Sequence, residues 1–266
     1  MEEKVCHKCE KPRPLSEFYA SKQHKDGLNP WCKSCYSDAG KIRYEKRCLK
    51  NPPSFRRICD QIHHTYFSVV DQPLQAYLLG LLAADGNILE RFSRITLELS
   101  VKDYELLTLV RDELAPGYNI RKRVRKEPTR FGTGATGTVT FTSRMMVGDL
   151  ARFNIGPKKT LTLRWPVNLP MNLAPAYLLG YFDGDGFITS YVASNHTYAV
   201  WGLTSGSIEF LNDVISIVKE QTGITIRGPY HKSSQSFVIR AYGTRAVAID
   251  QWLHADGLGL SRKHVR

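Results

Sequence analysis

Two uniformly apolar stretches dominate the hydrophobic pattern of the chain. Residues 77–88 read YLLGLLAADGNI, and residues 177–188 read YLLGYFDGDGFI. Before Asp-Gly, the residues of each stretch are apolar on every side of a helix, so we expect two helices that are buried all round. Asp71 with Pro73 precedes the first stretch, and Asn172 with Pro175 precedes the second. A capping side chain followed by proline in the first turn is typical of a helix start.

The elements after each apolar stretch recur in the same order, which indicates an internal repeat. In the first half the pattern predicts a hairpin strand, a helix, two strands, a helix and a basic cluster, over 95–101, 103–114, 118–126, 137–143, 144–153 and 157–160. In the second half the same order falls on 197–205, 208–221, 224–230, 236–243, 244–257 and 261–264. Matches of six elements in order predict two copies of an αββαββα-like unit. The expected fold is therefore of the mixed α/β (α+β) class, with two pseudo-symmetric halves.

Small residues predict that the two apolar helices pack against each other. They lie on one face of each helix, as Gly80, Ala83 and Ala84 in the first and as Gly180 and Gly184 in the second. Such residues let two helix backbones approach closely. We therefore expect the helix pair to form the seam between the halves. Close packing would then bring Asp85 and Asp185, at the ends of the helices, next to each other.

Two adjacent carboxylates at Asp85 and Asp185 would need a cation. They repel each other, which raises one pKa unless a positive charge intervenes. Hard oxygen ligands suit Mg²⁺, with Mn²⁺ as the alternative. With a basic surface nearby, this pair predicts a site that cleaves phosphodiesters. The competing interpretation is that Ala-Asp-Gly and Gly-Asp-Gly are turns that end buried helices. Because the motif occurs twice, in register, we favour the metal site.

The net charge of the chain indicates which classes of binding partner to expect. Its 266 residues carry a formal net charge of +12, which predicts a polyanionic partner, with nucleic acid as the first candidate. An anionic membrane is disfavoured because no long basic amphipathic helix is present, and a merely soluble basic protein stays open. The longest apolar run, near residues 76–84, is too short to span a bilayer, and no signal peptide opens the sequence. We expect a cytoplasmic monomer with internal pseudo-twofold symmetry.

Four cysteines form two CxxC pairs near the start of the sequence: Cys6, Cys9, Cys32 and Cys35. This spacing predicts a four-cysteine zinc site. A module of residues 1–50 buries little surface, so Zn²⁺ would supply its stability. Disulfides are disfavoured in a reducing cytoplasm, and a redox CxxC is disfavoured without a βαβ context. His7 and His24 are weaker candidates as ligands.

A basic segment follows the fourth cysteine. Residues 41–50 hold three lysines and two arginines around Tyr44. They are predicted to form a short helix or arm against phosphates, or a solvated linker face. Pro52-Pro53 breaks any helix, and we place the domain boundary there. Residues 51–70 are taken as a linker, with a connecting helix possible over 54–70.

The doubled motif resembles a known family. Segments 78–86 (LLGLLAADG) and 178–186 (LLGYFDGDG) resemble the LAGLIDADG homing endonucleases in their double-motif monomeric form, over residues 71–266. Residues 6–35 resemble the small zinc modules of phage-type homing endonucleases. The resemblance implies two halves, 71–167 and 168–266, with saddle-shaped antiparallel sheets that grip double-stranded DNA. It also implies a site-specific, metal-dependent staggered double-strand cut in a long target, as in intron homing.

The resemblance implies roles for the motif residues. Asp85 and Asp185 match the acids that bind the catalytic metals, and we place Ala84 and Gly184, directly before them, at the same Mg²⁺ site. An earlier acid of the family motif matches Asp183 in the second copy, but the first copy has Ala83. We expect this departure to affect helix-end packing or contacts around the ligands, and the balance between the two strands cut.

Family members also keep a basic residue near the active site late in each half. The matching clusters are Lys158-Lys159 and Arg262-Lys263. We choose Lys159 and Lys263, because they follow Asp85 and Asp185 at similar distances along the chain. Their expected role is to polarise the surroundings of the attacking water or to offset charge on the pentavalent phosphate. A plain phosphate-binding lysine is the alternative.

Strand alternation predicts which side chains face DNA. With Ile120 and Val124 directed towards the helices, an outward surface of basic and hydroxyl side chains remains. Its candidates are Arg121, Arg123, Arg125, Thr138, Thr140, Arg227 and Arg240. Arginine can pair with guanine edges and threonine with several bases. A solvated polar sheet face is the competing interpretation.

Two other functions fit the same scaffold. A non-catalytic DNA-binding regulator or an intron-RNA maturase would bind nucleic acid without cutting it. The presence of both acids argues against these alternatives. An intein is disfavoured because the sequence starts with Met1 and lacks a terminal His-Asn.

Overall fold

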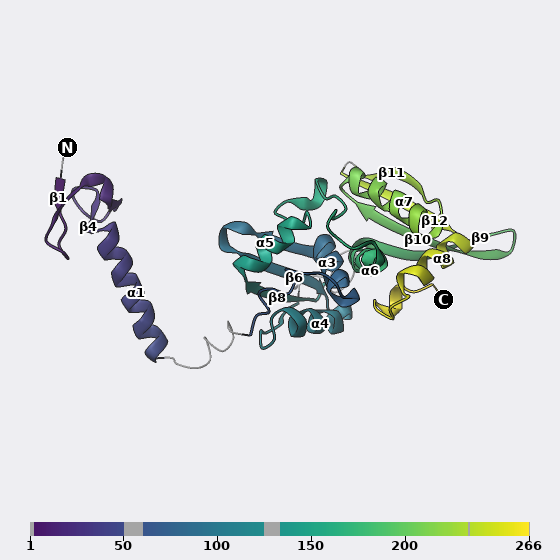
Figure 1. Ribbon diagram of the computed structural model, residues 1–266, viewed down its shortest axis with the longest axis horizontal. Helices are drawn as coiled ribbons and strands as arrows, with labels where there is room; N and C mark the ends of the chain where they lie inside the picture. The colour runs from purple at the N-terminus through teal and green to yellow at the C-terminus, as the bar shows by residue number, and fades with distance from the viewer. Residues whose placement is uncertain (1–2, 51–60, 125–133, 234, 266) are drawn as a thin grey trace. The chain divides into compact units, whose positions relative to one another are not determined.

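The computed structural model describes residues 3–50, 61–124, 134–233 and 235–265. It divides the chain into two compact units, Met1–Asp60 and Gln61–Arg266 (Figure 1). Among the described residues, no helix is both long enough and apolar enough to cross a membrane.

The first unit is a small module built around the cysteines. Strand β1 (Glu3–Val5) pairs with β2 (Pro12–Pro14), and β3 (Phe18–Ala20) pairs with β4 (Leu28–Cys32). Helix α1 (Lys33–Lys50) follows and includes residues 41–50, for which a short helix or arm was one of the predictions; it begins earlier, at Lys33. The expected boundary at Pro52-Pro53 lies outside the described residues. The buried core of this unit consists of Phe18 and two of the cysteines, so the module has little apolar surface with which to hold itself together.

The second unit repeats one topology twice (Figure 1). The first copy contains α3 (Pro73–Asp85), β5 (Gly86–Leu89), β6 (Arg94–Ser100), α4 (Tyr104–Leu114), β7 (Arg121–Arg123), β8 (Thr136–Thr142) and α5 (Arg144–Arg152). The second contains α6 (Ala174–Asp185), β9 (Gly186–Ala193), β10 (His196–Ser205), α7 (Ile208–Thr222), β11 (Arg227–Ser233), β12 (Ser236–Tyr242) and α8 (Thr244–Leu253). Both antiparallel sheets have equivalent strand orders, β5-β6-β8-β7 and β9-β10-β12-β11. The predicted pair of αββαββα halves is therefore confirmed.

Helices α3 and α6 form the seam between the two sheets (Figure 1). A Cβ atom added to Gly80 would lie 1.9 Å from the carbonyl oxygen of Tyr177, and one added to Gly180 would lie 1.9 Å from that of Tyr77. Each glycine thus contacts the backbone of the other helix, and no larger residue fits at this separation. The reciprocity of the two contacts is what a pseudo-twofold axis through the seam produces.

Two expectations about the start of the second unit are wrong. Residues 61–70 are not a linker, because Ile62, Phe67 and Val70 are buried in the same core as the seam helices. Nor does Asp71 cap α3, whose N-cap is Gln72. The side-chain oxygen of Gln75 accepts hydrogen bonds from the backbone N–H groups of both Asp71 and Gln72, at 3.1 Å.

The cap of the other seam helix also differs from the prediction. Helix α6 has Leu173 at its N-cap in place of the expected Asn172, because a short 3₁₀ turn (Met171–Leu173) leads directly into the helix. The predicted proline in the first turn is present in both helices.

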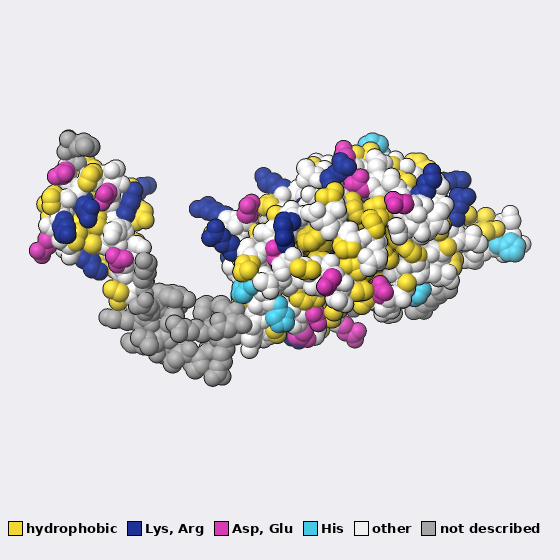
Figure 2. All heavy atoms as spheres, in the orientation of Figure 1, with side chains coloured by type: hydrophobic (Ala, Val, Ile, Leu, Met, Phe, Trp, Pro, Cys, Tyr) yellow, Lys and Arg dark blue, Asp and Glu magenta, His cyan; other side chains and the backbone are white. Residues whose placement is uncertain are grey.

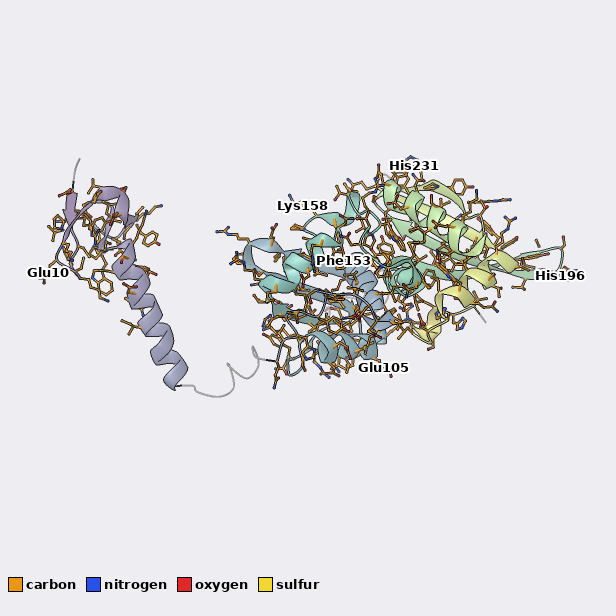
Figure 3. All side chains as sticks on the ribbon, viewed as in Figure 1. Glu10, Glu105, Phe153, Lys158, His196 and His231 are labelled. Carbon is orange, nitrogen blue, oxygen red and sulfur yellow. The ribbon has the colours of Figure 1, made fainter. Side chains whose placement is uncertain are left out.

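The two halves differ most in their first hairpins. Strands β9 and β10 have 8 and 10 residues, whereas β5 and β6 have 4 and 7. The longer hairpin turns at Ser194 and Asn195, both with positive φ, and it extends beyond the rest of its sheet to His196 (Figure 3).

Candidate active site at the paired helix ends

The ends of the two seam helices are in contact. Asp85 is the last residue of α3 and Asp185 the last of α6. A Cβ atom added to Gly184 would lie 2.5 Å from Cβ of Ala84 and 2.8 Å from Oδ2 of Asp85. The glycine in the second motif thus makes room for the carboxylate of the first. The structure therefore brings together the four motif residues that the sequence singles out for Mg²⁺.

The pKa values of the two aspartates at the helix ends are both raised. Desolvation by the surrounding protein, and then the charge of Asp185, raise the pKa of Asp85 to about 6, although its side chain is exposed to solvent. The pKa of Asp185 is also raised, mainly by desolvation, while a hydrogen bond from Tyr181 and nearby lysines oppose the rise. Carboxylates held close together with access to solvent suit a divalent cation, which would lower both pKa values.

Ala84 and Gly184 can contribute only backbone oxygens to such a site. The carbonyl of Gly184 accepts a hydrogen bond from Nζ of Lys263 at 3.2 Å. The carbonyl of Asp185 accepts one from the hydroxyl of Thr204 at 2.8 Å. The carboxylates of Asp85 and Asp185 thus remain the strongest ligands at the two helix ends.

Both predicted lysines lie at the helix ends. Lys159, in a 3₁₀ turn (Lys159–Leu161), donates to the carbonyl of Gly86, which directly follows α3. Lys263 is 8% exposed and donates to the carbonyls of Phe182, Asp183, Gly184 and Gly186 at 2.6–3.2 Å. Desolvation lowers the pKa of each lysine, and the charge of Asp85 acts against that in both.

The two lysines are therefore not equivalent. An ammonium group has three N–H donors, and Lys263 has four carbonyl acceptors around it, so its protons are all engaged at the end of α6. Its charge also stabilises the carboxyl end of the helix dipole. Lys159 has one acceptor among the described residues. Lys263 therefore holds the helix end in place, and Lys159 is the better candidate for contact with a substrate phosphate.

One difference between the motifs, Asp183 against Ala83, has a structural consequence. Asp183 is buried, and its Oδ2 accepts hydrogen bonds from the hydroxyl of Tyr77 at 2.6 Å and from the N–H of Leu260 at 2.9 Å. Tyr177 is the equivalent residue of the other helix. Its hydroxyl is buried and has no hydrogen-bond partner among the described residues. The expected effect of Ala83 on helix-end packing thus corresponds to one unpaired hydroxyl.

We expect Tyr77→Phe and Tyr177→Phe to differ in stability although they remove the same atom. Tyr77→Phe leaves the buried Asp183 carboxylate short of a donor and should lower the free energy of unfolding by about 1–3 kcal/mol. Tyr177→Phe removes an unpaired buried polar group and should be neutral or stabilising. Urea denaturation of both variants, compared with the wild type, measures the difference. Equal losses would contradict the hydrogen-bond assignment.

The four cysteines meet in the first unit. Their sulfur atoms lie within 4.8 Å of one another, and Cys6 and Cys32 are fully buried. Cys6 Sγ accepts a hydrogen bond from the N–H of Cys32 at 3.2 Å. Burial alone would raise the pKa of Cys6, but hydrogen bonds from the backbone of Cys32, Cys9 and Lys8 outweigh it and lower the pKa to about 6. A stabilised thiolate within a four-sulfur cluster is the donor set that Zn²⁺ prefers. Neither His7 nor His24 belongs to the cluster.

The outer face of the first sheet carries the predicted polar side chains. Cross-strand partners share a face, and Arg121 lies opposite Thr138 while Arg123 lies opposite Thr136. The hydroxyl of Thr140 is 3.2 Å from that of Thr96. The inward positions of β8, Val139 and Phe141, are buried as expected.

Two details of this face differ from the prediction. Strand β7 ends at Arg123, so Val124 does not point into the core and is 72% exposed. Arg125 lies outside the described residues. Arg94, opposite Thr142 on the same face, was not singled out from the sequence.

The second sheet presents arginines and aromatic rings. Arg227 and Arg240 are direct cross-strand partners, and like charges in such pairs destabilise a sheet. The same face carries aromatic side chains that the sequence analysis missed, namely Phe187, Tyr191, Tyr198 and Tyr242. Alternating aromatic residues along β9 and β10 were the available signal. Figure 2 shows Lys and Arg side chains gathered towards the outer parts of this unit, with a largely hydrophobic area in the centre of the visible face.

Among the comparisons with known proteins, only the one with solved structures found similar chains. Scans of family models and of curated proteins give no match. Homing endonuclease I-WcaI bound to its DNA recognition sequence is 15% identical, with a TM-score of 0.49 over 74% of this chain and 88% of that one. The N-terminal LAGLIDADG domain of DUF199/WhiA is 16% identical, with a TM-score of 0.46 over 74% and 89%. LAGLIDADG meganuclease I-AabMI bound to uncleaved DNA is 12% identical, with a TM-score of 0.46 over 71% and 85%.

At such identities and scores, the likeness says nothing about activity. The features that matter are the chain's own doubled motif, its repeated topology and its paired helix ends. By these features of its own the chain has a LAGLIDADG-like fold.

Proposed function

We propose that the chain is a site-specific DNA endonuclease that makes a staggered double-strand cut with Mg²⁺ or Mn²⁺. The observation that carries this proposal is the contact between the two motif ends, with Asp85 beside Gly184 and coupled to the charge of Asp185. A pair of acids at a seam between two sheets gives one metal-binding centre for both halves. Two Asp-Gly turns that only ended their helices would not need to lie next to each other.

The residues at the helix ends would have different roles in cleavage. Asp85 and Asp185 would hold the divalent metal, which supplies charge stabilisation and an activated water when bound. Lys159 would add positive charge beside the cleaved phosphate through its unengaged N–H groups. Lys263 keeps the end of α6 in place through its four carbonyl contacts. Ala83 leaves one side of the seam with an unpaired tyrosine, and we infer that the two strands are cut at unequal rates.

The two sheet faces would bind duplex DNA. Phosphate charge would relieve the repulsion between Arg227 and Arg240, and Arg121 and Arg123 would act in the same way on the first sheet. The hydroxyls of Thr138 and Thr140 can hydrogen-bond base edges. A long target follows, because the two sheets lie on either side of the seam. We further propose that the chain acts as a monomer.

The amino-terminal module is proposed to bind Zn²⁺ through Cys6, Cys9, Cys32 and Cys35. Helix α1 would extend the DNA footprint through its basic residues. The alternative function, a non-catalytic DNA-binding regulator or an RNA maturase, would use the same basic faces without the metal at the seam.

The direct test is a cleavage-site selection with the full-length chain on a library of long duplexes. We expect a single class of site, cut in both strands with Mg²⁺ or Mn²⁺ and left intact with EDTA. Binding to the selected duplex should persist with EDTA, because the sheet contacts need no catalytic metal. Tight duplex binding without cutting at any divalent metal would favour the regulator, and preference for structured RNA would favour the maturase.

A further inference from the structure

A small cavity at the outer face of the second sheet is lined by three arginines. It has a volume of about 300 Å³. Arg227 enters it from β11, Arg240 from β12, and Arg245 from the first turn of α8. Among the described residues, no aspartate or glutamate lines it. Several positive charges around one small space, without an acid, are an arrangement that favours an anion.

The pairing of the strands forces two of these charges together. Arg227 and Arg240 are direct cross-strand partners, and Arg240 is half-buried. Like charges in such pairs destabilise a sheet. Within the described parts of the chain, none of the three arginines forms an ion pair or a side-chain hydrogen bond. The repulsion is therefore not offset by an acidic partner among these residues.

The start of α8 adds positive charge of a different origin. Thr244 and Arg245, the first two residues of this helix, both line the cavity. The N-cap is Gly243, no side chain caps the first turn, and that turn contains no acidic residue. The free N–H groups at the start of a helix carry partial positive charge and favour an anion. Backbone and side chains thus favour the same sign of ligand.

Two tyrosines complete the wall of the cavity. The rings of Tyr191 and Tyr242 lie with their centroids 6.0 Å apart and nearly perpendicular, at 80°. Tyrosine hydroxyls are common donors to phosphate oxygens in complexes with DNA. The planar donor fork of arginine matches the geometry of phosphate oxygens. The donors around the cavity therefore suit a phosphate group.

The cavity is separate from the paired helix ends. Arg240 pairs with Gly202 on β10, and Gly202 pairs with Phe187 on β9, the second residue after Asp185. Neighbouring strands are about 4.8 Å apart, so the backbones of Arg240 and Phe187 are separated by roughly 10 Å. A phosphate in the cavity would therefore not be the one that is cleaved.

We propose that this cavity holds one backbone phosphate of the bound duplex and thereby fixes the register of the DNA on the second half. This inference rests on the proposed function. It assigns Arg227, Arg240 and Arg245 to the DNA backbone, where contacts position the protein without reading sequence directly. The competing role is hydrogen bonding to guanine edges in the major groove.

The first test replaces single phosphodiesters of the duplex with neutral methylphosphonates. The duplex is selected by binding alone to the full-length chain, without divalent metal. We expect one position at which wild-type affinity falls about 10-fold and at which Arg245→Ala shows no further loss. If wild type and variant lose the same factor at every position, the proposal is overturned. It is also overturned if inorganic phosphate protects the wild type from unfolding while no position is sensitive, since the cavity then takes a free anion.

The second test separates a phosphate contact from a base contact. Arg245→Ala should weaken binding to the selected duplex and to a scrambled one by a similar factor. It should also lower the slope of log affinity against log salt by about 1. Arg164→Ala removes the same net charge from an exposed pair with Asp213 and should leave the slope unchanged. A changed preference at one base pair, with an unchanged slope, would overturn the proposal.

A third variant excludes a merely structural role. Arg227→Ala removes the repulsion with Arg240, so without DNA at low salt it should unfold at the wild-type temperature or above. The same variant should bind the duplex about 10-fold more weakly. A lower unfolding temperature would show that Arg227 supports the sheet and would overturn the assignment. None of these measurements depends on cleavage, so a chain that binds in this way without cutting would contradict only the proposed endonuclease activity.

Discussion

Replacing either helix-end aspartate with asparagine is expected to abolish double-strand cleavage and to leave DNA binding intact. Asparagine keeps the shape of the side chain but removes the negative charge that would bind the proposed cation. Because both halves would contribute to the one proposed metal centre, Asp85→Asn and Asp185→Asn should each reduce the cleavage rate by about 10³-fold or more. Cleavage of the selected duplex measures the rate, and gel shift with EDTA measures binding.

Asp213→Asn is a suitable control for this pair. Asp213 forms an exposed ion pair with Arg164 away from the motif ends, so its loss should change neither cleavage nor binding beyond about 2-fold. Full cutting of both strands by Asp85→Asn would contradict the assignment of the metal site.

Asp85→Asn has a second expected result, which concerns the stability of the folded chain. The pKa of Asp85 in the folded chain is raised from 3.8 to about 6, so between these values the folded state holds a proton that the unfolded chain has lost. Stability without metal should therefore fall as pH rises through this window. Asp85→Asn removes this charge, and at pH 7.5 without metal it should be at least as stable as the wild type. A less stable variant would show that Asp85 has a structural partner instead.

Gly80→Ala is expected to be one of the most damaging small changes to the fold. The added Cβ would lie 1.9 Å from the carbonyl oxygen of Tyr177 and 2.9 Å from the backbone nitrogen of Tyr181. These are backbone atoms, which no rotamer change can move away. The helices must separate, and we expect a loss of about 3 kcal/mol or more, equivalent to a fall in Tm of roughly 10 °C for a unit of this size.

A glycine in another helix provides the matched control. Gly148 lies in α5, and a Cβ atom there would meet no atom of the described residues within 4 Å. Gly148→Ala should therefore be neutral or raise the free energy of unfolding by up to about 1 kcal/mol, as alanine favours a helix. Thermal unfolding of both variants makes the comparison. If Gly80→Ala unfolds at the wild-type temperature, the seam is not packed as described.

The sequence alone was sufficient to predict the internal repeat and the packing of α3 against α6 at the seam. The two apolar stretches have a doubled pattern of small residues, and backbone contact through Gly80 and Gly180 follows from that pattern. The alternation of β8 likewise predicted the buried positions of Val139 and Phe141. Each of these features depends on local periodicity, which the sequence records directly.

Features that depend on distant contacts were not predictable. Phe67 belongs to the core because the preceding chain folds against the seam, and nothing local marks it. The family resemblance, with the spacing within each half, placed Lys263 near the aspartates, but its four carbonyl acceptors depend on the path of the carboxyl-terminal segment. Val124 is exposed because β7 is short.

The unequal hairpins give the molecule a polarity that its repeated topology alone would lack. Strand β9 is twice as long as β5, and β10 is nearly one and a half times as long as β6. The two ends of the proposed binding surface are therefore not interchangeable. A palindromic target would satisfy one end better than the other. The preferred duplex should therefore be directional, with more base pairs covered on the side of the longer hairpin.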